Sequence, residues 1–238
     1  MSYVTHFDAI KRLVEVSSIR GKAKVTLSYD DFISIIRLMI ADVEVNEAWY
    51  LGQYPDVAEA VALWLIRSKP FGELPLLVGG ESIGATISLL TLLRLRDLHG
   101  LTGNFRSMNL IAGNYDFSMT PSQRLAPESY FLSPAVQRSN QATVFPGRSP
   151  EELRAPGISA LYADVTGLPP ALLTVGTADS VLDDSMFMAA RLAAAGGRAE
   201  LQIYPEGTHP FMTLPTAMAR EARRRVVRFL RFSIDGND

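Results

Sequence analysis

The chain has 238 residues, 47% of them hydrophobic and 20% charged, with a formal net charge of −2 at pH 7. This length, with this proportion of hydrophobic to charged residues, predicts one globular domain over residues 1–238 with a sizeable core. The same composition argues against a disordered chain. The near-neutral charge gives no electrostatic basis for binding nucleic acid or an anionic membrane. The absence of cysteine excludes disulfides, a thiolate nucleophile and thiolate metal ligands.

The N-terminal residues give weaker patterns than the rest of the chain. Alternating valines around Arg20-Gly21 favour two strands joined by a turn, residues 32–41 fit either a helix or a strand, and residues 42–55 lack periodicity. The opening stretch MSYVTHFDAIKRL has no basic segment followed by a long apolar core, and the most apolar early run is too short to span a bilayer. We therefore expect a cytoplasmic protein that does not enter a membrane.

Strand and helix patterns alternate from residue 57 onward. Apolar residues at helical spacing predict a helix over 57–68, and the continuous apolar run over 73–80 predicts a strand covered on both faces. A largely apolar helix follows over 84–98, and SMNLIAGNYD predicts another strand and a turn. Residues 118–167 are rich in proline, serine and glutamine, and we expect them to fold as a lid or pocket-forming excursion.

The last part of the chain repeats this alternation. PPALLTVGTAD predicts a buried strand, residues 183–195 a helix, and AELQIYPEGTHPF a strand that ends in a loop. Residues 215–232 predict an amphipathic helix whose arginines form a solvated face. Apolar strands that alternate with helices predict an α/β fold, in which helices cover both faces of a mostly parallel sheet.

The stretch Gly80-Glu81-Ser82-Ile83-Gly84 fits the pattern G-x-S-x-G between a predicted strand and a predicted helix. A serine presented as a nucleophile at such a sharp turn needs small neighbours, because the turn brings the backbone against adjacent strands. Amides at the start of a helix lack intrahelical acceptors, so the Ile83 N–H is a candidate oxyanion-hole donor. The alternative is a structural turn in which Ser82 has no chemical role.

A serine nucleophile needs a base, and the base needs an acid that orients it. The chain contains three histidines, His6, His99 and His209. His99 ends the helix that begins beside Ser82, about 20 Å away by helix rise, whereas His209 follows the last predicted strand. Asp179 follows the preceding strand, so Ser82, Asp179 and His209 are expected at the carboxyl edge of one parallel sheet, where α/β proteins form their sites.

Structural interpretations of the same residues are the alternatives. A loop histidine can simply face solvent, and an aspartate after a strand can cap the next helix. Asp183 and Asp184 fall in the first turn of that helix, where acidic residues are expected as partners of the helix dipole. The chain order Ser82, Asp179, His209 is the order found in α/β-hydrolases, which favours the catalytic interpretation.

The stretches GGESIGA, TLLRLRDLHGLTG, GTADSVLDDS and YPEGTHPF resemble the hormone-sensitive-lipase-like branch of the α/β-hydrolases, which includes bacterial acetyl esterases and carboxylesterases. The resemblance runs from about Val57 to the C-terminus. It implies an α/β-hydrolase fold in which Ser82 is the nucleophile, His209 is the general base and then acid, and Asp179 orients the imidazole. It implies a small acyl-ester substrate, no cofactor and no metal.

The N-terminal part departs from that family. Its members carry a His-Gly-Gly-Gly motif whose amides supply much of the oxyanion hole, whereas this sequence has no such motif and its residues 1–56 form a short, atypical region. Because one lost oxyanion donor costs about 10²–10³ in rate, we expect a weak esterase restricted to activated or short acyl esters. A hydrolase-fold protein that binds without turnover is one alternative, and a lactonase or amidase using the same three residues is another. An apolar face left by the short N-terminal region would favour a homo-oligomer.

Overall fold

The structure is a computed structural model that describes residues 47–236, with side chains described from residue 57 onward. The elements in chain order are α3 (Glu47–Ser68), β1 (Leu76–Glu81), α4 (Ile83–His99), β2 (Phe105–Ile111), α5 (Pro121–Leu125), α6 (Pro134–Val144), α7 (Pro150–Leu153), η1 (Ala160–Tyr162), β3 (Ala171–Ala178), α8 (Leu182–Ala194), β4 (Ala199–Thr208), η2 (Phe211–Thr213) and α9 (Ala217–Asp235). The strands predicted around Arg20-Gly21 and the segment 32–41 lie outside the described residues.

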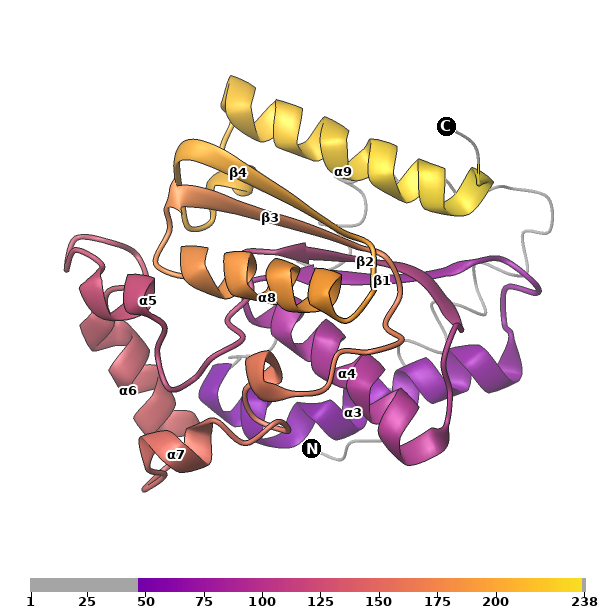
Figure 1. Ribbon diagram of the computed structural model, residues 1–238, viewed down its shortest axis with the longest axis horizontal. Coiled ribbons are helices and arrows are strands. Elements are labelled where there is room, and N and C mark those ends of the chain that lie inside the picture. The colour runs from indigo at the N-terminus through magenta and orange to yellow at the C-terminus, as the bar shows by residue number, and fades with distance from the viewer. Residues whose placement is uncertain (1–46, 237–238) are drawn as a thin grey trace, which may run out of the picture.

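Four parallel strands form the sheet in the described part of the chain, in the spatial order β1-β2-β3-β4. Each strand reaches its parallel neighbour through a crossover that contains a helix, as parallel pairing requires. α9 packs against β2 and β3 on one face, whereas α4 and α8 cover the other face and α3 packs against α4 (Figure 1). The predicted α/β class, with helices on both faces of a parallel sheet, is confirmed.

The helix predicted over 57–68 is the second half of a longer helix. α3 begins at Glu47, so the prediction of irregular structure is wrong from residue 47 to residue 55. Pro55 lies inside this helix, where a proline removes one backbone donor and crowds the preceding turn, and this is why local propensity favours a break there. Tertiary packing, here of α3 against α4, supplies most of a helix's stability and outweighs that propensity.

β1 and β3 differ in burial, although the sequence predicts a covered strand in both places. Six of the eight residues of β3 are buried, whereas all six residues of β1 are half-buried or exposed. β1 lies at the edge of the four strands, with β2 as its neighbour among the described residues. The prediction of a strand covered on both faces is therefore wrong for β1, because burial depends on the neighbours of a strand as well as on its composition.

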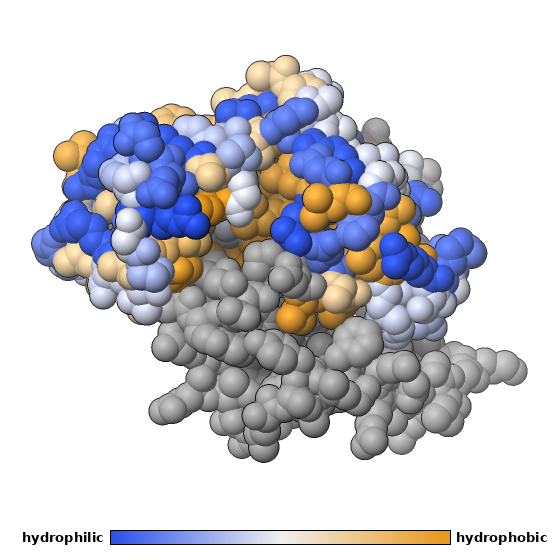
Figure 2. All heavy atoms as spheres, turned by 90° about the horizontal axis from the view of Figure 1, so that it is seen from below, coloured by the Kyte–Doolittle hydropathy of each residue, from blue (hydrophilic) through white to orange (hydrophobic). Residues whose placement is uncertain are grey.

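Two apolar clusters, one on each face, hold the sheet and its helices together. The larger cluster joins α4 and α8 to the sheet and includes Leu89, Met108 and Met188. The smaller cluster includes Ala222 of α9 and Phe211, which anchors the segment after β4. Hydrophilic residues cover most of the described surface seen in Figure 2, with hydrophobic residues gathered between them. None of the described helices is long and apolar enough to cross a membrane.

The connection between β2 and β3 contains α5, α6, α7 and η1. The first three of these helices lie beyond the carboxyl ends of the strands (Figure 1). Side chains that follow β1, β3 and β4 project from the same end of the sheet. The connection is therefore placed beside the candidate site.

Candidate active site

Ser82 occupies a strained turn between β1 and α4. Its φ of 56° and ψ of −125° lie in a region that residues with a side chain rarely adopt, at a cost of about 1–3 kcal/mol. A Cβ on Gly80 would lie 2.3 Å from the carbonyl carbon of Gly84, so the turn requires glycine at position 80. The Ser82 N–H donates to the Ile111 carbonyl at 2.8 Å, which ties the turn to β2. Backbone strain of this kind, held by its surroundings, is typical of functional sites.

His209 follows β4 and lies between Ser82 and Asp179. Its Nε2 is 3.0 Å from Ser82 Oγ, and its Nδ1 is 2.9 Å from Asp179 Oδ2. The side chains of His209 and Asp179 are 5% and 0% exposed. The structure thus brings the three residues singled out from the sequence into one hydrogen-bonded row at the carboxyl edge of the sheet.

Asp179 uses its two carboxylate oxygens for different partners. Oδ1 accepts the N–H of Val181 at 3.1 Å and shapes the turn after β3, which leaves Oδ2 for His209. α8 begins at Leu182 with Val181 at its N-cap. The alternative in which Asp179 caps the next helix is therefore wrong, because its local hydrogen bond closes the turn before the helix.

Asp184 lies in the first turn of α8, but its contacts exceed those of a helix-dipole partner. It is fully buried. It accepts four hydrogen bonds, from the Tyr115 and Asp116 amides, the Thr120 hydroxyl and the Gln123 side-chain amide, at 2.7–2.9 Å. Burial raises the pKa of Asp184 to about 7, against the lowering effect of these donors. Asp184 therefore fastens the start of the β2–β3 connection to α8.

Ser122 fastens the same connection to the turn that carries Asp179. Its hydroxyl donates to the Ser180 carbonyl at 2.7 Å and accepts the Asp183 N–H at 3.1 Å. Its own N–H donates to Asp183 Oδ2 at 2.7 Å. Sequence reasoning missed Ser122 and the hydrogen-bonding role of Asp184, and the adjacent pair Asp183-Asp184 is the signal that could have pointed to them.

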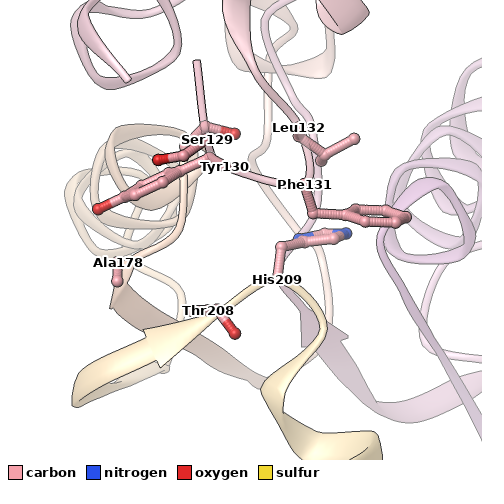
Figure 3. Close-up of a pocket in the computed structure, with 8 residues that line it drawn as sticks. Ser129, Tyr130, Phe131, Leu132, Ala178, Thr208 and His209 are labelled. Carbon is pink, nitrogen blue, oxygen red and sulfur yellow. The ribbon is translucent and has the colours of Figure 1, made fainter. Parts of the chain in front are cut away.

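Two further residues lie beside these three hydrogen-bonded residues, and the sequence analysis assigned neither of them a role. Phe131 stacks on His209, with ring centroids 6.1 Å apart and ring planes 13° apart (Figure 3). Glu81 directly precedes Ser82, and one of its carboxyl oxygens is buried without a hydrogen-bond partner in the described part of the chain. Burial raises the pKa of Glu81, while the charge of His209 opposes that rise and the charge of Asp179 adds to it.

Ile83, the candidate oxyanion donor, is the first residue of α4. Its N–H is one of the four amides that helix geometry leaves without an intrahelical acceptor, and it follows Ser82 directly. Among the side chains described, those from residue 57 to residue 236, no group of three or more histidines, aspartates or glutamates could hold a metal ion. The chemistry that this arrangement supports is activation of the Ser82 hydroxyl by a buried, oriented imidazole.

Comparisons with known proteins identify the fold family. A model of the alpha/beta hydrolase fold family matches residues 47–213. The crystal structure of EstE5, soaked with p-nitrophenyl butyrate, is 26% identical with a TM-score of 0.64, over 74% of this chain and 59% of that one. A hyperthermophilic esterase from the archaeon Pyrobaculum calidifontis is 25% identical with a TM-score of 0.64, over 71% and 57% of the two chains.

The fold also matches that of a hormone-sensitive lipase from a metagenome library, which is 22% identical with a TM-score of 0.68 over 76% of this chain and 61% of that one. No curated protein sequence gives a significant match. The chain spans about three fifths of the length of these solved structures.

Proposed function

Because the chain belongs to the α/β-hydrolase fold family, and within it is similar to hormone-sensitive-lipase-like esterases, we propose that it hydrolyses carboxylic esters through an acyl-serine intermediate. The observation that carries the proposal is the row of Ser82, His209 and Asp179, joined at 3.0 Å and 2.9 Å. Burial of the acid and the imidazole supports it, since a water-excluded pair holds one orientation.

The acylation step follows from the hydrogen bonds that join Ser82, His209 and Asp179. With Asp179 accepting the hydrogen of Nδ1, Nε2 of His209 is free to take the proton of Ser82 as Oγ attacks the ester carbonyl carbon. The Asp179 carboxylate stabilises the imidazolium that forms. The Ile83 N–H stabilises the negative oxygen of the tetrahedral intermediate.

The second half of the cycle returns the protein to its starting state. His209 gives its proton to the leaving alcohol oxygen as the C–O bond breaks, which leaves the acyl group on Ser82. A water molecule then attacks the acyl carbon while His209 takes its proton, and the carboxylic acid leaves as Ser82 regains a hydrogen. One ester and one water give one acid and one alcohol.

The expected activity is slow. The sequence contains no His-Gly-Gly-Gly stretch, so Ile83 is the one oxyanion donor that we assign. A missing donor costs about 10²–10³ in rate. We therefore propose that activated or short-chain acyl esters are the substrates that this protein turns over.

Hydrolysis of p-nitrophenyl acetate and p-nitrophenyl butyrate tests the proposal. The unchanged protein is compared with Ser82→Ala and His209→Ala, which we expect to lose at least about 10⁴ in kcat because the members of such a row act as a unit. Ser88→Ala is the matched control, since Ser88 lies on α4, the helix that begins after Ser82, and within the described residues its hydroxyl bonds only to the Gly84 carbonyl. Equal rates for the unchanged protein and both site variants would refute the proposal.

A further inference from the structure

A cavity of about 240 Å³ lies against His209, between the β2–β3 connection and the ends of β3 and β4. Its lining comprises Ser129, Tyr130, Phe131, Leu132, Ala178, Ser180, Thr208 and His209 (Figure 3). His209 belongs to this lining, whereas Ser82 does not. The cavity therefore lies on the histidine side of the proposed nucleophile.

This position relates the cavity to one part of an ester. In the proposed reaction, His209 takes the proton of Ser82 and then delivers it to the leaving oxygen, so the alcohol part must lie beside the imidazole. The acyl part stays on Ser82 and extends away from His209. A cavity walled by His209 is therefore placed to hold the alcohol part.

The cavity offers hydroxyl groups that the protein itself does not use. Four lining residues carry a hydroxyl, and that of Ser180 accepts the side-chain amide of Gln137 at 3.2 Å. The hydroxyls of Ser129, Tyr130 and Thr208 make no hydrogen bond within the described residues. Because a hydroxyl both donates and accepts, three free ones suit a ligand that has hydroxyl groups of its own.

The remaining lining adds an aromatic surface and no formal charge. Phe131 is 71% exposed although one of its faces lies on His209, and in Figure 3 Tyr130 points away from it to the opposite side. Apart from His209, no lining residue is ionisable near pH 7. An aromatic face beside hydroxyls suits a neutral ring that has apolar C–H faces and polar edges.

We propose that this cavity binds the alcohol part of the substrate and selects a neutral hydroxylated ring, such as a monosaccharide, over an alkyl alcohol. This inference rests on the proposed function, because it assigns the alcohol side of the same site. The reaction is then hydrolysis of a sugar ester: one water is consumed, the acyl C–O bond breaks, and the acid and the free sugar hydroxyl leave.

Two esters with the same acyl group test this selection. Methyl 6-O-acetyl-α-D-glucopyranoside and cyclohexylmethyl acetate both present a six-membered ring on a CH₂–O–acetyl group, but only the first carries hydroxyls. We expect kcat/KM for the sugar ester to exceed that for the cyclohexyl ester by about tenfold or more, which corresponds to about 1.4 kcal/mol. A ratio of one or less would overturn the inference.

Variants then test which residues set the ratio. Tyr130→Phe and Thr208→Val each remove one free hydroxyl while keeping the shape of the side chain. We expect each variant to lower the ratio of kcat/KM for the sugar ester to kcat/KM for the cyclohexyl ester about threefold or more. Tyr204→Phe, which removes a hydroxyl outside the cavity lining, should leave the ratio as it is. An unchanged ratio in both cavity variants would contradict the assignment.

Two controls separate this inference from the proposed function. Hydrolysis of p-nitrophenyl acetate that depends on Ser82, together with no preference for the sugar ester, would overturn the inference and leave the esterase proposal standing. Binding of methyl α-D-glucopyranoside and of cyclohexylmethanol to Ser82→Ala, followed by saturation-transfer NMR, needs no turnover. We expect a signal from the glucoside that weakens in the double variant with Tyr130→Phe, and a signal from cyclohexylmethanol alone would refute the inference.

Discussion

The two halves of the candidate site are held in place by different means. Asp179 and His209 follow β3 and β4, and buried hydrogen bonds fix both side chains. Ser82 follows β1, which has no buried residue, and close backbone packing at Gly80 fixes its turn. The side chains of the acid and the base are thus buried and hydrogen-bonded, whereas the turn that carries the serine depends on the close approach of two backbone segments.

This difference shows how each half can fail. A hydrogen-bonded half is sensitive to the exchange of one atom for another, because a buried donor or acceptor loses its partner. A half held by close packing is sensitive to any added atom, because nothing can move aside. The predictions below apply one kind of change to each half.

Asp179→Asn should have the largest effect. An asparagine of nearly the same shape can turn its NH₂ group toward Nδ1 and favour the wrong tautomer of His209, with an expected loss of about 10⁴ in kcat. Hydrolysis of p-nitrophenyl acetate measures it. Asp183→Asn is the matched control, because Asp183 bonds to Ser122 and not to His209, and an equal loss in both variants would contradict the role of Asp179.

Gly80→Ala should damage the other half. The added Cβ would lie 2.3 Å from the carbonyl carbon of Gly84, so we expect a loss of about 1–3 kcal/mol in the free energy of unfolding, together with reduced esterase activity. Gly84→Ala adds the same atom where nothing lies within 4 Å. It should be neutral or slightly stabilising. Urea unfolding of both variants decides the matter, and equal stabilities would show that the turn is not held by packing.

Asp184→Asn should have the smallest effect on esterase activity, because Asp184 bonds to none of Ser82, Asp179 and His209, and its effect should appear in the pH dependence of stability. The folded pKa of Asp184 is raised from 3.8 to about 7, so the folded state binds this proton more tightly than the unfolded state does. The stability contributed by this group is present below about pH 4 and is lost as the pH rises to about 7. The melting temperature should fall less steeply with rising pH in the variant than in the unchanged protein. An equally steep fall in both proteins would contradict the raised pKa.

Most of the fold after residue 57 could be predicted because its signals are local. β3 is a largely apolar run, and Gly100, the residue after α4, adopts the left-handed conformation that commonly ends a helix at glycine, with its N–H bonded to the Arg96 carbonyl. The convergence of Ser82, Asp179 and His209 followed from their places after parallel strands, since such strands share one carboxyl edge. A parallel topology turns sequence order into spatial proximity.

The features that the sequence did not reveal depend on contacts between distant segments. The hydrogen bonds of Asp184 join residues more than 60 positions apart, and Phe131 reaches His209 from a separate connection. Neither contact produces a periodic pattern along the chain. The early start of α3 was hidden for another reason, because Pro55 is a local signal that the packing of the helix overrides.

Labelling with diethyl p-nitrophenyl phosphate tests most directly whether Ser82 is an activated nucleophile. The reagent transfers its diethylphosphoryl group to such a serine and releases p-nitrophenol, and mass spectrometry of the digested protein locates the group. We predict one diethylphosphoryl group on Ser82, formed at least about 100-fold more slowly in His209→Ala because the hydroxyl then lacks its base. Labelling of another serine, or an equal rate in His209→Ala, would contradict the account.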